Sequence, residues 1–172
     1  MDYLTGYPTT KHQNDVMLVV VNKFSKMAIL IPCKKNTTSQ QISQLFFKHV
    51  WKYFVLPTII ISDRDGRFII TFWKTLWKYI NTRLSLLKDF HPQTGRQMKV
   101  VNRLVVQLLR MYNHKHRQTW DDNLSHIQQN YNHAQHNSTC KSPFEIYYVF
   151  QPSTPINLIS SSTHSNDTDY KG

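Results

Sequence analysis

Two aspartates, Asp2 and Asp63, stand where carboxylates from separate strands could share a metal ion. Asp63 directly follows the apolar run TIIIS, which is typical of a buried strand, and Asp2 lies in the strand-like segment MDYLTGYP. Carboxylate oxygens can together hold a hard cation such as Mg²⁺. Two-metal phosphoryl chemistry needs further carboxylates to hold the second ion. The pair suggests metal-dependent chemistry, although a lone Asp in this setting more often caps a turn.

Short motifs in a fixed order extend this hypothesis over residues 1–150. They are MDYLTGYP, LVVVNKFSKMAILIPCKK, LPTIIISDRDGRF, HPQTGRQ, VNR and NSTCKSPFEIYY. In this order they resemble the catalytic core of a retroviral-type integrase, in particular that of gypsy-class LTR retrotransposons. The resemblance implies an RNase H-like fold that joins DNA strands with two Mg²⁺ or Mn²⁺ ions and works as a multimer. It implies that Asp2 and Asp63 are the first two of three catalytic, metal-binding carboxylates.

Lys99 occupies the position at which the resemblance implies the third carboxylate, a glutamate. Thirty-five residues separate it from Asp63, and the residues on both sides keep the register of the motif. No Asp or Glu occurs between Asp89 and Asp121 that could replace it. An ammonium group here would neutralise nearby carboxylates and repel a divalent ion. We therefore expect weak or absent metal binding and inefficient strand transfer.

The sequence leaves three interpretations open, and with them the question of whether the chain is an enzyme. The first is an integrase core by descent that binds nucleic acid without efficient catalysis. The second is a working integrase with a substitute metal ligand. The third is a non-catalytic interaction protein or the remnant of an element. Val55 and Cys140 replace glycines usual in the family, and these changes favour a degenerate copy.

The apolar pattern predicts the elements that would position these residues. Besides the MDYLTGYP segment, strands are expected at 15–21, 26–32, 57–62 and 83–88, and helices at 37–54, 68–80, 95–117, 120–134 and from Pro143. Ser39 or a nearby Thr is the expected N-cap of the first helix. The short turn makes the second and third strands antiparallel, and the crossover helix makes later pairs parallel.

This order of elements predicts an α/β fold, a mixed five-stranded sheet flanked by helices, which is RNase H-like by the resemblance. Since the chain begins within the first expected strand, that strand is expected to be truncated. Residues 1–150 would form the integrase core-like domain. Residues 151–172 are rich in Ser, Thr, Asn and Pro, and we expect a polar, disordered tail.

The helix expected from Gly95 has a basic stripe. On a helical wheel, a set of basic residues falls within an arc of about 60°. They are Arg96, Lys99, Arg103, Arg110 and Arg117. The opposite side, expected to face the core, contains Val101, Leu104, Val105, Leu108 and Tyr112. The stripe contains no acid, which favours phosphate contacts over a merely solvated face. His91 and Gln93, in the preceding HPQT loop, are further candidate contacts.

Charge and composition indicate the partner and the compartment. The chain has 21 Lys and Arg against 10 Asp and Glu, a formal net charge of +11. This excess favours DNA as the partner over a membrane, with RNA left open and a homo-oligomer implied by the resemblance. The two cysteines suggest no disulfide framework. Without a secretory signal, we expect an intracellular protein, nuclear or cytoplasmic.

Overall fold

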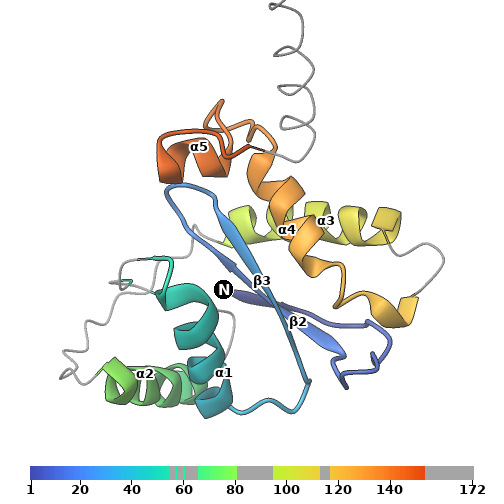
Figure 1. Cartoon of the computed structure of the whole chain (residues 1–172). Coiled ribbons are helices and arrows are strands. Elements are labelled where there is room, and N and C mark those ends of the chain that lie inside the picture. Colours follow the sequence, from blue (N-terminus) through green and yellow to red (C-terminus); the bar gives the residue numbers. More distant parts are fainter. Residues whose placement is uncertain (55–56, 58–59, 61–65, 81–94, 113–116, 154–172) are drawn as a thin grey trace, which may run out of the picture.

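The computed structural model of the chain describes residues 1–54, 57, 60, 66–80, 95–112 and 117–153 (Figure 1). The strands are β1 (Asp2–Leu4), β2 (Val16–Val21) and β3 (Ala28–Cys33). The helical elements are α1 (Ser39–Phe46), the π-helical turn η1 (Phe47–Trp51), α2 (Gly66–Ile80), α3 (Gly95–Tyr112), the 3₁₀ turn η3 (Arg117–Thr119), α4 (Leu124–His133) and α5 (Pro143–Tyr148).

The described strands form an antiparallel sheet in the order β1-β2-β3. The predicted α/β class and the predicted antiparallel hairpin are both confirmed. The Asn22 side chain builds the turn of this hairpin, because its Oδ1 accepts hydrogen bonds from the backbone N–H groups of Phe24, at 2.9 Å, and Ser25, at 3.0 Å. Of the two further strands predicted, 57–62 lies largely and 83–88 wholly outside the described residues. A five-stranded sheet therefore stays a prediction.

Helices cover both faces of this sheet, with α1 and α2 on one side and α3 and α4 on the other (Figure 1). The core on the first side includes Val16, Leu18, Ile29, Ile31, Ile42, Phe46, Phe72 and Leu76. The core on the second includes Met17, Val19, Ala28, Leu30, Val101, Val105, Leu109, Trp120 and Ile127. Alternate strand residues enter alternate cores, so burial of both faces explains why the strands read as continuous apolar runs.

Side chains of α4 occupy the outer edge of β3. Asn132 accepts a hydrogen bond from the Ala28 N–H and donates one to the Ala28 carbonyl, both at 2.9 Å. Gln128 Oε1 accepts from the Leu30 N–H, also at 2.9 Å. Pro32 follows in the same alternation and has no N–H to satisfy. Along these residues the edge of β3 is therefore hydrogen-bonded by side chains in place of another strand.

Two helices begin at capping boxes. Thr38 caps α1, because its Oγ1 accepts from the Gln41 N–H at 3.3 Å and Gln41 Oε1 accepts from the Thr38 N–H at 2.9 Å. Ser142 caps α5 in the same way with Glu145. The predicted Thr cap of the first helix is confirmed. The helix predicted at 37–54 is shorter, since α1 passes into the π-helical turn η1 at Phe47.

The helix predicted to start at Trp120 begins instead at Leu124. Trp120 is buried, and its indole Nε1 donates a hydrogen bond to the Pro8 carbonyl at 2.9 Å. Trp120 therefore contacts the connection between β1 and β2, and α4 starts only after it. The helix predicted at 95–117 is described as far as Tyr112, residues 113–116 lie outside the described part, and Arg117 belongs to η3.

The buried face of α3 differs in part from the predicted one. Val101, Val105 and Leu109 are buried, in a row with a spacing of four residues. The prediction was right for Val101 and Val105 but wrong for Leu104 and Tyr112, which are exposed. Apolar residues occupy most of the helix circumference outside the basic stripe, so the helical wheel does not determine which row packs.

The predicted domain limit at residue 150 stays a prediction, because 154–172 lie outside the described residues. No helix in the described part of the chain is both long and apolar enough to cross a bilayer.

Candidate nucleic-acid site at Asp2 and helix α3

Asp2 is the first residue of β1, where it lies opposite Val19 of β2. Its side chain is half-buried, and both carboxylate oxygens accept hydrogen bonds. Oδ1 accepts from the backbone N–H of Tyr3 at 2.8 Å, and Oδ2 accepts from the side-chain amide of Asn102 on α3. Asp2 therefore connects the edge of the sheet to the N-terminal half of α3.

Asn102 is a site residue that was not predicted from the sequence. It lies in the VNR motif, three residues after Lys99, a spacing that puts two residues on neighbouring positions of one helix face. Its Nδ2 donates to Asp2, while its Oδ1 is buried and has no hydrogen-bond partner among the described residues. The motif was the available signal, but only the packing of α3 against β1 identifies its partner.

Three residues of the predicted basic stripe, Lys99, Arg103 and Arg110, are exposed on α3. Arg96 lies in the first turn of α3, and its side chain is outside the described part. Burial raises the pKa of the Tyr7 hydroxyl, and the nearby Arg110 guanidinium acts in the opposite direction. The stripe therefore extends along α3 from the region of Asp2 to the β1–β2 connection.

Asp63, His91 and Gln93 lie outside the described residues, so their distances from Asp2 are not defined. No group of three or more His, Cys, Asp or Glu side chains in the described part is arranged to hold a metal ion. Asp2 alone does not form such a site, and Asn102 already donates a hydrogen bond to one of its carboxylate oxygens. The described residues therefore do not fit a two-metal centre by themselves.

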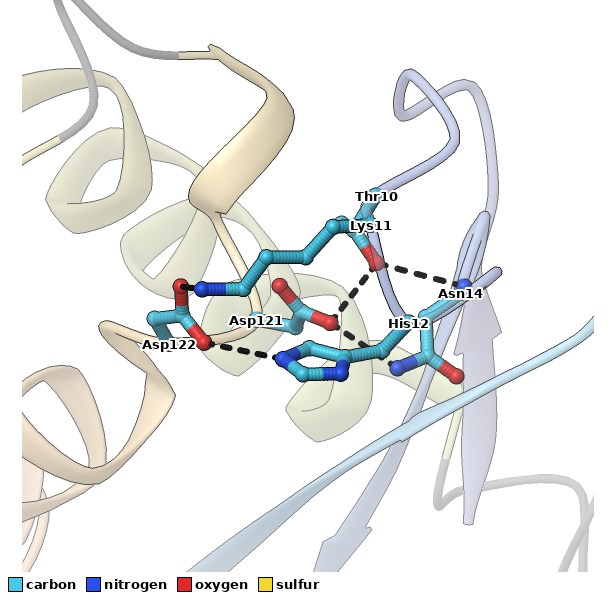
Figure 2. A network of polar contacts seen from close by, with 6 residues as sticks. All are labelled: Thr10, Lys11, His12, Asn14, Asp121 and Asp122. Carbon is cyan, nitrogen blue, oxygen red and sulfur yellow. Dashed lines mark hydrogen bonds and ion pairs between the residues drawn. The ribbon is translucent and has the colours of Figure 1, made fainter.

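A polar network anchors the loop between β1 and β2 to the segment before α4. Figure 2 shows the loop side chains gathered around Asp121 and Asp122. Asp121 Oδ2 accepts from the Thr10 hydroxyl at 2.7 Å and from Asn14 Nδ2 at 2.9 Å. Thr10 is buried and Asp121 is half-buried, so these hydrogen bonds are partly shielded from water.

Asp122 forms the exposed part of the same network (Figure 2). Its carboxylate pairs with Lys11 Nζ at 2.9 Å and with His12 Nε2 at 3.4 Å. The hydrogen bond from Lys11 lowers the pKa of Asp122, and the same contact raises the pKa of Lys11. Surface pairs of this kind contribute little to stability, so Asp121 is the main anchor of the loop.

Fold and site together describe a mixed α/β domain in which a basic helix crosses the end of a strand that carries an aspartate. No protein-family model matches the chain. It is 38% identical over 168 residues to the Tf2-3, Tf2-4 and Tf2-5 transposon polyproteins of Schizosaccharomyces pombe (strain 972 / ATCC 24843). The alignment covers 97% of this chain and 12% of each polyprotein. Nearly the whole chain is thus similar to one region of transposon polyproteins.

Proposed function

We propose that the chain is an integrase core-like, nucleic-acid-binding domain of a retrotransposon polyprotein that does not catalyse efficient strand transfer. The hydrogen bond from Asn102 to Asp2 carries this proposal. Asn102 lies three residues beyond Lys99, so the contact brings the relevant part of α3 to the first aspartate, in the register that the sequence motifs imply. Similarity to transposon polyproteins supports the same conclusion.

The edges of the sheet are consistent with an RNase H-like arrangement. The outer edge of β3 is hydrogen-bonded by Asn132 and Gln128, whereas β1 is the other outer strand among the described residues. A further strand would therefore add beside β1. A strand at 57–62 in that place would bring Asp63, which follows it directly, to the neighbourhood of Asp2.

Lys99 explains why such a site would bind nucleic acid without efficient chemistry. In the family, divalent ions polarise the phosphoryl group and activate the nucleophile. A lysine supplies a fixed positive charge that attracts phosphate but does not perform either task. Lys99 is exposed beside Arg103 and Arg110, and α3 contains no acidic residue, so this face suits a DNA backbone.

The proposal is tested with a branched DNA substrate on which the core of an integrase can reverse strand transfer. Wild type, Lys99→Glu, and Lys99→Glu with Asp63→Asn would be assayed in Mg²⁺. We expect modest activity in Lys99→Glu alone, because this change restores the third carboxylate and Asp63→Asn removes the second. Activity of the wild type would contradict the role given to Lys99 and favour a substitute ligand. Inactivity of all three would show that Lys99 is not the principal defect.

A further inference from the structure

A second surface of the molecule exposes aromatic side chains from two segments that are far apart in the sequence. We call it the aromatic patch and define it as Trp51, Tyr53, Tyr148, Val149 and Phe150. All five are exposed, with Val149 at 89% and Phe150 at 62%. Trp51 is the last residue of η1 and Tyr53 lies just after it, whereas Tyr148 ends α5 and Val149 and Phe150 follow it. None of these residues belongs to the site at Asp2.

Ring contacts join the two segments into one surface. Phe54 and Tyr147 meet edge to face, with ring centroids 5.0 Å apart. Tyr148 and Phe150 lie in a tilted arrangement at 6.0 Å. Tyr147 and Tyr148 also meet edge to face, with ring centroids 5.0 Å apart. Burial raises the pKa of Tyr148, and Tyr147 and Tyr53 raise it further. The exposed rings are therefore held on a common packed base.

Two unusual backbone features hold these rings at the surface. In the π-helical turn η1, Phe47 and Trp51 stack nearly parallel, with centroids 4.8 Å apart and an angle of 9°. Such turns are rare and often occur at functional sites. Val149 ends α5 in the left-handed conformation, with φ 67°, which is uncommon for a β-branched residue. This conformation ends the helix immediately before the exposed Phe150.

The patch lies beside positive charge. Lys48 and Lys52 are exposed on and just after η1, and Lys52 Nζ lies 4.8 Å from the centroid of the Tyr53 ring. Burial lowers the pKa of His49, and the two lysines lower it further. The sequence contains no Asp or Glu between Asp15 and Asp63. Flat rings beside cations are the groups that bind unpaired nucleobases and their phosphates.

We propose that the aromatic patch binds single-stranded nucleic acid by stacking its bases. A duplex does not fit this chemistry, because its bases already stack on one another. A second copy of the chain packed symmetrically on this patch would bring Lys48 and Lys52 near the same lysines of the other copy, which like charge disfavours. The proposal is independent of the function proposed for Asp2 and α3, since it uses different residues and predicts a different preference between single and double strands.

The test compares a fluorescently labelled oligothymidylate with a duplex of the same length, by fluorescence anisotropy. The variants are Tyr53→Ala, Phe150→Ala and Tyr53→Phe, all at exposed positions. Phe24→Ala is the matched control, because Phe24 is 83% exposed on the β2–β3 turn. Each variant is also made in an Arg103→Ala, Arg110→Ala background, in which binding through α3 is weakened.

We expect Tyr53→Ala and Phe150→Ala each to weaken oligothymidylate binding by about fivefold or more, in both backgrounds, with duplex affinity unchanged. Tyr53→Phe should retain binding because it keeps the ring. Unchanged binding of the oligonucleotide by both alanine variants would overturn the proposal. An equal loss of oligothymidylate affinity in Phe24→Ala would overturn it as well. So would a change from dimer to monomer in sedimentation of Tyr53→Ala or Phe150→Ala, or selective binding of an acidic aromatic peptide in place of the oligonucleotide.

Discussion

The contact between Asp2 and Asn102 is the feature on which the interpretation of this chain depends. The motifs point to Asp2, Asp63 and Lys99, but they do not show that an amide one turn beyond Lys99 holds the first aspartate. A charged acceptor and a fixed donor form a hydrogen bond stronger than a neutral one. The Asn102 amide therefore fixes the Asp2 carboxylate against α3 in the structure described.

Replacing Asn102 should show how much this contact stabilises the fold. Asn102→Ala removes the donor to Oδ2 of the half-buried Asp2 and leaves only the Tyr3 N–H on Oδ1, so we expect the free energy of unfolding to fall by about 1 to 3 kcal/mol. Lys99→Ala is the matched control on the same helix and should change it little, because Lys99 is exposed. Urea denaturation of both variants measures the difference. Equal losses would mean that the contact does not contribute to stability.

At the scale of elements, local signals predicted more than the helical wheel did. The hairpin, the Thr38 cap and α5 follow from a turn, a capping box and the dipeptide Ser142–Pro143, all of which act within a few residues. The buried row of α3 and the late start of α4 depend on contacts over about a hundred residues, such as that of Trp120 with Pro8. Sequence periodicity does not contain that information.

The basic stripe on α3 is tested by the salt dependence of duplex DNA binding. Arg103→Ala with Arg110→Ala should weaken binding and reduce the slope of log affinity against log salt concentration by roughly two, one for each phosphate that an arginine no longer neutralises. Lys74→Ala with Lys78→Ala is the matched control, because both lysines are exposed on α2. Equal effects of the two double variants would mean that net charge, and not the stripe, drives binding.

At the scale of the whole molecule, two separate cores and one polar network hold the sheet between its helices. The continuous apolar strands predicted buried strands, but they did not predict that α4 side chains would occupy the edge of β3. The network of Figure 2 was not predicted either, since nothing local relates Thr10 to Asp121. Among the described residues, these long-range contacts cover the outer edge of β3 and tie the β1–β2 connection to the segment before α4.

Asp121 and Asp122 provide a matched test of the network. Asp121→Ala removes two partly shielded hydrogen bonds, and we expect the free energy of unfolding to fall by about 1 to 3 kcal/mol. Asp122→Ala should have a much smaller effect, since its ion pair is exposed. Lys11 lowers the pKa of Asp122, so this small contribution is present above the ordinary carboxyl pKa and is lost as the pH falls. A larger loss of unfolding free energy in Asp122→Ala than in Asp121→Ala would mean that Asp122, and not Asp121, is the main anchor of the loop.

The central claim, that Lys99 removes the metal site of an integrase core, is tested most directly by magnesium titration. Calorimetry would compare the wild-type chain, Asp63→Asn, Lys99→Glu, and Lys99→Glu with Asp63→Asn. We predict no submillimolar Mg²⁺ site in the wild type, a clear gain in Mg²⁺ affinity in Lys99→Glu, and loss of that gain in the double variant. A submillimolar site in the wild type that Asp63→Asn abolishes would contradict the claim.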